Sequence, residues 1–277
     1  MRWRFSCALI LAASAACADP LTFVRATTLA ADVRDFGGLS AIEMEGPDSA
    51  IVLSDRGQAF SLAFDRTTGA IAVARMVQPR PDRDSEGLAF AAGRLYFSYE
   101  GPAEIFTQSG QAIDPHPDFA TLPSNRSLEA LAGDADGTLY ALPERALGKD
   151  VTFPIYRYRD GAWDVAGHLP KVGLFLPTGA DIGPDGMLYI LERALSPFGF
   201  RTQIRRVDPN APEREAEILL NTYPGQHDNL EGLAIWQSDS GATCLSMVSD
   251  DNFRAIQRSE LVEYALTETL ADGAHCD

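Results

Sequence analysis

Basic residues are scarce in this sequence, and lysine is nearly absent. The chain has 23 lysines and arginines against 39 aspartates and glutamates, which gives a formal net charge of −16 at pH 7, and only Lys149 and Lys171 are lysines. Binding to nucleic acid or to an anionic membrane surface requires basic patches. The composition therefore disfavours both kinds of partner, and it slows the approach of a polyanionic substrate unless a bound cation intervenes.

Long apolar runs are also missing, because no stretch reaches the roughly 20 residues that a membrane-spanning helix needs. The apolar run from Phe5 to Ala16 has about 12 residues, follows two arginines and leads to small residues around Ala18,. This pattern is typical of a signal peptide over residues 1–18. We therefore expect a periplasmic or secreted domain over 19–277, with a net charge of −18 after the two arginines are lost. Anchoring as a lipoprotein at Cys17 is the alternative, although leucine is missing from its lipobox.

Cysteine is rare as well, with four in the chain. Two of them, Cys7 and Cys17, lie in the expected signal peptide, which leaves Cys244 and Cys276. An even pair in an oxidising compartment predicts one disulfide. Two cysteines are too few for a structural zinc site.

The common catalytic and nucleotide-binding motifs do not occur. The sequence has no Gly-x-Ser-x-Gly element, so it gives no support to an α/β-hydrolase triad,. It also has no P-loop and no dinucleotide fingerprint, which argues against a nucleotide cofactor,.

What the sequence does contain is a two-part phrase that recurs five times. The first halves start 49, 43, 49 and 53 residues apart, at 37–42, 86–90, 129–132, 178–182 and 231–235. Each is followed by a turn rich in aspartate, glycine or proline, which is the chemistry of tight hairpins. An apolar, β-forming run that ends in charged residues then follows, at 51–56, 95–100, 139–145, 187–193 and 244–251,.

With the further strands expected between these phrases, each unit resembles a four-stranded propeller blade. We therefore predict an all-β fold made of a single β-propeller, with five blades of about 52 residues each,. Six blades is the alternative. The N-terminal strand 21–29 has no blade of its own, so we expect it to complete the last blade and close the ring, which hides exposed strand edges. We expect a monomer.

The repeat also predicts where the functional residues gather. In a blade the innermost strand begins on one face of the ring and the second strand returns to that face. The mouth of the channel on that face should hold Glu86, Glu129 and Glu231, with Asp55 and Asp250 beside them. Carboxylates of this kind are hard oxygen ligands, suited to calcium or another divalent cation. Further acidic residues expected at this mouth are Glu100, Glu144 and Asp251.

Three arginines at the same strand ends are the candidate substrate-binding residues: Arg56, Arg145 and Arg193, together with the acidic neighbour Glu192. Guanidinium groups match carboxylate and phosphate oxygens. The structural alternative is that these acid–arginine pairs tie neighbouring blades together. His227, on the loop leading to the mouth, is the one histidine that we take as a candidate acid–base group,. The stretch 194–200 extends the mouth-side loop of the fourth unit. We expect it either to cover the site as a lid or to be an ordinary long surface loop.

Several of these segments resemble the phytase-like family, which is named for an "esterase-like activity of phytase". The matching segments are 37–40, 54–56, 86–88, 191–193 and 229–233, in the same order along nearly the whole chain. The resemblance implies an exported propeller with a hydrolase function, and some members are linked by name to phytases that use calcium. The lysine-rich phosphate site of true propeller phytases is not evident here.

These observations lead to two functional hypotheses. The first is a metal-assisted hydrolase that acts on a small ester or phosphoester at the propeller mouth. The second is a propeller that binds a small ligand or a protein without catalysis, because a fold alone does not decide function.

Overall fold

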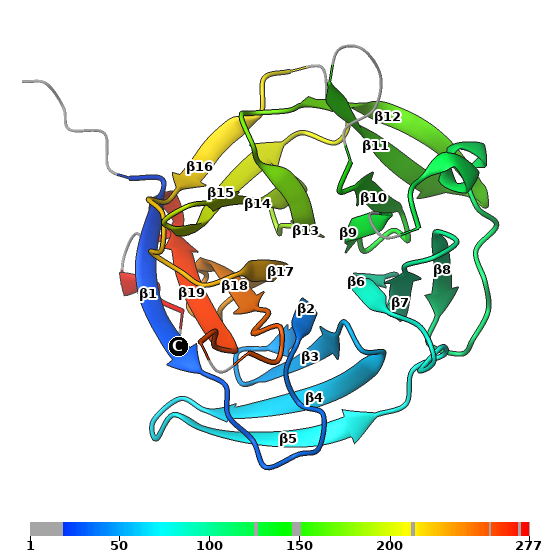
Figure 1. The fold of residues 1–277 in the computed structure, drawn as a ribbon. Helices are drawn as coiled ribbons and strands as arrows, with labels where there is room; N and C mark the ends of the chain where they lie inside the picture. Colours follow the sequence, from blue (N-terminus) through cyan, green and yellow to red (C-terminus); the bar gives the residue numbers. More distant parts are fainter. Residues whose placement is uncertain are drawn as a thin grey trace, which may run out of the picture.

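The computed structural model describes residues 19–124, 127–145, 151–211, 214–254, 256–270 and 273–276. The signal peptide predicted for residues 1–18, with Cys7 and Cys17, lies outside the described residues. Within the described part, the strands form five antiparallel sheets arranged as blades around a central channel (Figure 1). The prediction of a five-bladed all-β propeller is confirmed.

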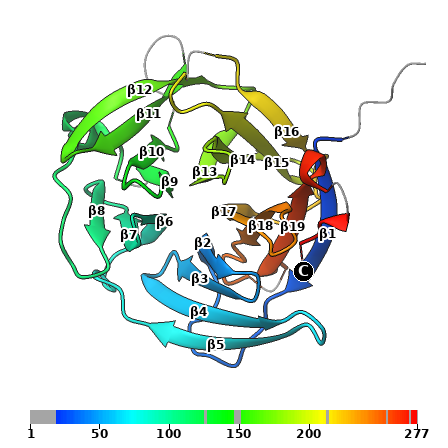
Figure 2. The same cartoon turned by 180° about the vertical axis from the view of Figure 1, so that it is seen from behind.

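Three blades have four strands that follow one another in the chain. The first blade contains β2 (Leu39–Gly46), β3 (Ser49–Ser54), β4 (Gln58–Asp65) and β5 (Ala70–Met76). The third contains β9 (Leu128–Gly133), β10 (Leu139–Pro143), β11 (Thr152–Arg159) and β12 (Ala162–Pro170). The fourth contains β13 (Leu176–Ile182), β14 (Leu188–Ser196), β15 (Gly199–Val207) and β16 (Glu217–Asn221). The first strand of each lies next to the channel, as both views of the ring show (Figures 1 and 2).

The second blade departs from the four-strand prediction. It consists of β6 (Ser85–Ala91), β7 (Arg94–Tyr99) and β8 (Glu104–Thr107), and the only further pairing described there is a bridge between Phe106 and Ala112. The chain after β8 is polar and rich in proline, and it forms a short 3₁₀ helix, η1 (Pro117–Thr121). Proline lacks the N–H that a strand ladder needs, which explains why no regular fourth strand forms among the described residues.

The fifth blade closes the ring with strands from both ends of the chain. It contains β17 (Leu230–Gln237), β18 (Thr243–Ser249), β19 (Glu260–Leu266) and, as its outer strand, β1 (Leu21–Thr28). β1 pairs antiparallel with β19 from Leu21 opposite Leu266 to Thr28 opposite Glu260. The predicted closure by the N-terminal strand is confirmed.

A disulfide joins Cys244 on β18 to Cys276, with the two Cα atoms 5.9 Å apart. It fixes the end of the described chain to the closing blade, as the cysteine pattern predicts. The short helical turn η2 (Thr267–Thr269) leads from β19 toward this bridge. Among the described residues, no helix is long and apolar enough to cross a membrane.

The core lies between neighbouring blades. Leu142 and Phe153 of the third blade, for example, pack against Leu188 and Ile190 of the fourth, and all four side chains are fully buried. The middle strands are therefore covered on both faces, which explains why their sequences read as continuous apolar runs. Burial on both faces fixes the register of the strands, and this register positions the residues at the channel mouth.

Candidate functional site at the channel mouth

Every innermost strand carries a bulge close to its start. The pairing register shifts between residues 39 and 41, 85 and 88, 128 and 130, 177 and 179, and 230 and 232. A bulge leaves a residue without a direct partner and re-aims its side chain. The residues within these five shifts are Ser40, Glu86 with Gly87, Glu129, Thr178 and Glu231. The repeat therefore supplies one polar side chain from each blade to the same level of the channel.

Glycines at or directly after some of these bulges let the innermost strands approach closely. A Cβ atom added at Gly87 would lie 2.8 Å from the Cβ of Leu131, and one at Gly179 would lie 2.6 Å from the carbonyl oxygen of Glu231. These distances are shorter than atoms in contact allow, so only glycine fits at these positions. The Glu-Gly-Leu phrase thus combines an acid at the channel with a close approach of backbones between blades.

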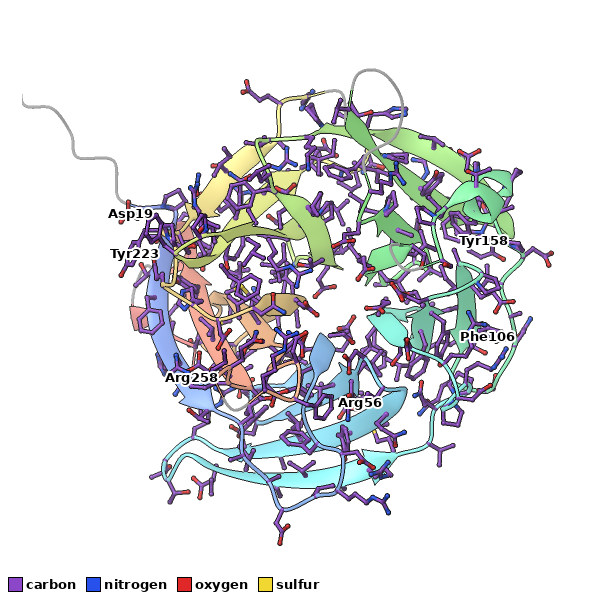
Figure 3. The ribbon with its side chains drawn as sticks, in the orientation of Figure 1. Asp19, Arg56, Phe106, Tyr158, Tyr223 and Arg258 are labelled. Atoms are coloured by element: carbon purple, nitrogen blue, oxygen red, sulfur yellow. A yellow bond between two sulfur atoms is a disulfide. The ribbon has the colours of Figure 1, made fainter. Side chains whose placement is uncertain are left out.

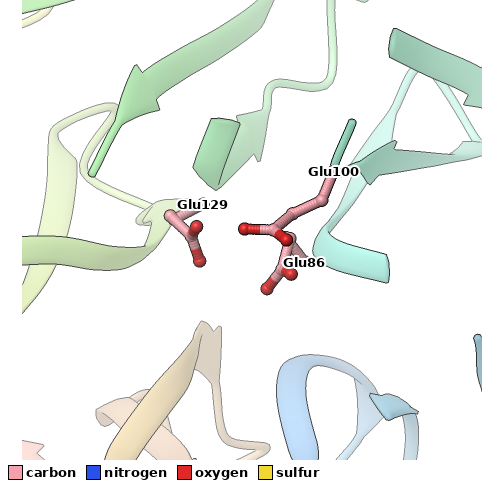
Figure 4. A group of neighbouring side chains, drawn as sticks. All are labelled: Glu86, Glu100 and Glu129. Atoms are coloured by element: carbon pink, nitrogen blue, oxygen red, sulfur yellow. The ribbon is translucent and has the colours of Figure 1, made fainter. Parts of the chain in front are cut away.

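Three carboxylates meet at this level. Glu86 on β6, Glu129 on β9 and Glu100, directly after β7, each place an oxygen within 4.8 Å of the other two (Figure 4). They come from two neighbouring blades and point toward one another. We call these three residues the carboxylate cluster.

Burial and neighbouring carboxylates raise the pKa values of the carboxylate cluster. Burial, reinforced by Glu129, raises the pKa of Glu86 well above its usual range. Burial and the nearby Glu144 raise the pKa of Glu129 to about 8. Burial and Asp84 raise the pKa of Glu100 to about 7. Because a bound cation would relieve both causes, the cluster has the electrostatic character of a cation site.

Glu231 lies at the same mouth but is paired differently. Its carboxylate forms an ion pair with Arg193 of the fourth blade and accepts a hydrogen bond from the Nδ2 of Asn229 at 2.8 Å. Arg193 also donates to the Oδ1 of Asn229 at 2.6 Å and lies 3.5 Å from Glu144. Burial raises the pKa of Glu231 to about 7 even though Arg193 acts in the opposite direction. The structure thus brings Glu86 and Glu129 together as predicted, but joins them with Glu100 in place of Glu231.

Asp55 and Asp250 occupy another part of the mouth. Asp250 accepts hydrogen bonds from the backbone N–H of Asn252 at 2.6 Å and from the Nδ2 of Asn229 at 3.3 Å. Burial, followed by the charge of Asp250, raises the pKa of Asp55 to about 6. Asn229 therefore connects Asp250 to Glu231, and neither Asp55 nor Asp250 belongs to the carboxylate cluster.

A hydroxyl group without a partner faces the same channel. Thr178 is 3 % exposed, and its Oγ1 has no hydrogen-bond partner among the described residues. Thr178 lines a small cavity together with Ser40, Glu86 and Glu129. The Oγ of Ser40, in contrast, donates to the carbonyl oxygen of Ser85 at 2.9 Å. The cavity has room for about one water-sized group, so the unsatisfied Thr178 oxygen marks a place for a water or an ion,.

Among the predicted arginines, Arg193 alone is bonded within the mouth. Arg56, labelled in Figure 3, is exposed at the end of β3, and its guanidinium carbon lies 3.5 Å from the ring centre of Phe253. Arg145 is exposed two residues after β10. Both have side chains that a ligand approaching from solvent can reach.

Two predicted site residues lie away from the mouth. Glu192 precedes Arg193 on β14, so its side chain points to the opposite face of the sheet, where it is fully buried and pairs with Arg205 at 2.5 Å,. The Nε2 of His227 lies 2.7 Å from the hydroxyl of Tyr264, and the ring stacks near Phe23. His227 is therefore packed against β19 and β1, the outer strands of the fifth blade, and burial lowers its pKa.

Comparison with solved structures supports the fold. An α-L-arabinofuranosidase from Podospora anserina, solved with cellotriose, matches with a TM-score of 0.52 at 11 % identity, covering 86 % of this chain and 94 % of that one. The tail fibre of a Staphylococcus aureus phage matches with a TM-score of 0.50 at 13 % identity, covering 91 % and 53 %. Regucalcin, a calcium-binding protein from Agrobacterium tumefaciens, matches with a TM-score of 0.46 at 13 % identity, covering 83 % and 78 %. At such low identity these similarities concern the fold alone.

Comparison with curated proteins finds no match. A family model does match, over residues 34–253, which include most of the ring and all the residues at its mouth described above. The family is described as "Phytase-like: Esterase-like activity of phytase". The match covers well over half of the chain, and the chain therefore belongs to the phytase-like family.

Proposed function

We propose that the propeller mouth binds a divalent cation through the carboxylate cluster, and that the protein is an exported hydrolase of a small ester or phosphoester at that site. The observation that carries the proposal is the convergence of Glu86, Glu100 and Glu129 within 4.8 Å. Calcium binds oxygen ligands at about 2.3–2.6 Å, so two ligands of one ion are at most about 5 Å apart. The spacing of the cluster fits that requirement.

The chemistry of the donor set also fits a hard cation. The cluster offers carboxylate oxygens only, and the unpartnered Thr178 hydroxyl lies beside Glu86 and Glu129 in the channel lining. Oxygen donors of this kind suit calcium or magnesium better than zinc. A cation would also favour the ionised forms of these carboxylates, whose pKa values burial and neighbouring carboxylates raise,.

In this proposal the residues of the mouth have separate roles. Glu86, Glu100 and Glu129 would hold the ion, which would polarise a carbonyl or phosphoryl oxygen and lower the pKa of a bound water,. Arg193, fixed by Asn229 and Glu231, keeps one positive charge near the developing oxyanion,. Arg56 and Arg145, exposed at the end of β3 and just after β10, are available to orient the substrate,. His227 has no role here, because its ring nitrogen is bonded to Tyr264.

Export is part of the proposal for two reasons. The Cys244–Cys276 disulfide is of the kind that persists in an oxidising compartment,. The signal peptide predicted for residues 1–18 would deliver the chain there.

The test of the metal site is thermal melting with calcium and with a chelator. An ion that binds only the folded protein stabilises it by about 2.7 kcal/mol at a hundredfold excess over its Kd. Calcium should therefore raise the Tm of the wild type, and Glu129→Gln should remove most of that rise. Glu45→Gln makes the same chemical change at an exposed position of β2 and should leave the rise intact. A wild-type Tm that does not respond to divalent cations would contradict the proposal.

A panel of carboxylic and phosphate esters tests the catalytic half. Turnover that is lost on chelation supports hydrolysis at the cation. The second candidate function is a propeller that binds a ligand without catalysis, and it is favoured by the exposed Arg56 and Arg145, whose guanidinium groups can bind carboxylate or phosphate oxygens without any catalytic group,. Stabilisation by a ligand in the absence of any turnover would favour this second function.

A further inference from the structure

The β14–β15 hairpin is longer than its counterparts in the other blades. Both strands have nine residues, whereas the second strands of the other blades have five to seven. The two strands stay paired from Leu188 opposite Val207 to Ser196 opposite Gly199. Arg193 lies at the channel mouth, so three further residue pairs extend about 10 Å beyond it, at roughly 3.3 Å per residue,.

The extension is apolar on the face that carries Arg193. Leu195 lies two residues beyond Arg193 on β14, and it pairs with Phe200 across the hairpin. The guanidinium carbon of Arg193 is 5.9 Å from the ring centre of Phe200. Leu195 is 65 % exposed, and Phe198 at the hairpin tip is 82 % exposed. An apolar surface thus begins next to the mouth and continues outward.

One neighbouring loop continues this surface. The backbone N–H of Gly225 donates to the carbonyl oxygen of Phe200 at 2.8 Å, which joins the hairpin to the loop that carries Tyr223. Tyr223 lies at the outer edge of the ring (Figure 3). We call the exposed side chains of this surface the apolar ledge: Leu195, Phe198 and Tyr223.

The charges next to the apolar ledge favour an uncharged ligand over a polyanion. Arg193 is already paired with Glu231 and lies near Glu144, so its charge is compensated within the mouth. With a divalent ion bound, the three ionised carboxylates of the cluster exceed the charge of the ion by one, and Asp250 lies at the same opening. A polyanion such as a polyphosphate is repelled by this arrangement even with one divalent ion in place, whereas an uncharged molecule is not.

We infer that the substrate is an uncharged carboxylic ester whose apolar chain or ring lies on the apolar ledge while its ester group reaches the carboxylate cluster. This inference rests on the proposed function. In the reaction, water adds across the acyl C–O bond and gives a carboxylic acid and an alcohol, so no further reactant is needed. Apolar contact on a partly open ledge buries only part of each methylene, and we expect about a twofold gain in binding for each one.

The experiment uses the full exported chain with calcium and p-nitrophenyl esters from acetate to octanoate, with p-nitrophenyl phosphate for comparison. The KM of the wild type should fall about twofold for each added methylene. The double variant Leu195→Ser/Phe198→Ser should lose that dependence. Ile218→Ser, at a 46 % exposed position on the outer strand β16, is the matched control and should keep it. The calcium-induced rise in Tm should be the same in all three proteins.

The outcomes separate this inference from the function on which it rests. Turnover that prefers the phosphate ester, or a chain-length dependence that survives in the double variant, overturns the ledge as the acyl site and leaves the hydrolase proposal standing. Absence of turnover on every ester overturns both. If the calcium-induced rise in Tm remains in that case, the cluster is a metal site without hydrolytic activity.

Discussion

Arg193 of β14 and Glu231 of β17 form an ion pair across the boundary between the fourth and fifth blades. Asn229 bonds both side chains at once, through its Oδ1 to Arg193 and through its Nδ2 to Glu231. The pair holds two blades together at the channel, and it also separates Glu231 from the carboxylate cluster. One mouth thus contains both a cluster of carboxylates, as the metal-site prediction requires, and an acid–arginine tie between blades, and different glutamates form the two.

Replacing Arg193 should therefore affect the stability of the ring. In Arg193→Gln, Glu231 would remain buried without its cationic partner, and removal of one member of a buried pair costs about 3 kcal/mol. Denaturation with urea should show this loss in the free energy of unfolding. Arg34→Gln removes an arginine whose side chain is 91 % exposed, and should change stability by less than about 0.5 kcal/mol,. Equal, small losses in both variants would contradict the bridging role of Arg193.

The raised pKa values predict how stability depends on pH in the absence of metal. Glu100 has a pKa of about 7 and Glu129 of about 8 in the folded protein, whereas glutamates in the unfolded chain titrate near 4.3,. Between about pH 4.5 and pH 8 the folded state therefore binds more protons than the unfolded state, so the free energy of unfolding falls as the pH rises through this window. Denaturation with urea at several pH values in the presence of a chelator measures this slope.

Calcium should change this pH dependence, because the ion binds the ionised carboxylates and competes with their protons. Its stabilising effect should grow from pH 6 to pH 8. In Glu129→Gln, one titrating group is lost, and both the slope without metal and the calcium effect should shrink. Burial also raises the pKa of Asp181 to about 7. A slope that is unchanged in Glu129→Gln would mean that other buried carboxyls such as Asp181 dominate the pH dependence.

The disulfide should contribute measurably to stability. A bridge between Cys244 and Cys276 closes a loop of about 30 residues and contributes about 3 kcal/mol,. The double variant Cys244→Ser/Cys276→Ser should lose this amount in urea denaturation and should expose the C-terminal segment to proteases. Mass spectrometry after alkylation of the non-reduced exported protein should find neither cysteine labelled. Two labelled thiols would refute the bridge in solution.

Removal of β1 should open the ring. Deletion of residues 21–28 exposes the edge of β19, which is paired over its whole length in the native protein. Unpaired strand edges promote aggregation, and the deletion also removes Leu21 from the core between blades,. The truncated protein should aggregate or lose cooperative melting by circular dichroism. A melting curve like that of the intact protein would show that the ring closes without β1.

The repeat predicted the arrangement of the fold because its signals are local. Each phrase contains a strand, a turn and a second strand, and the orphan N-terminal strand pointed to closure with the last blade. The second blade was the exception. Four strands were expected, but among the residues that the structure describes after Thr107, the polar, proline-containing chain forms a single bridge, between Ala112 and Phe106. The number of strands per blade was inferred from the regular units, so the missing outer strand of the second blade was not predicted.

The candidate site was harder to predict because side chains alternate along a strand. An error of one residue in register turns a side chain to the other face, and that distinction separates Arg193, at the mouth, from Glu192, buried against Arg205,. The role of Glu100 depends on distances between blades, which no local pattern contains. Thr178 stands at the start of a phrase where three other units have glutamate, and this change was the one sequence signal that could have drawn attention to it.

Closure of the ring by β1 also bears on how the protein can fold. β1 precedes every other strand of the ring and its partner β19 follows them, so this pair joins segments that have all the other blades between them. Pairings of such high sequence separation form slowly, and a chain in which this pair has not yet formed presents two open strand edges. We therefore expect closure of the ring to be a late step of folding.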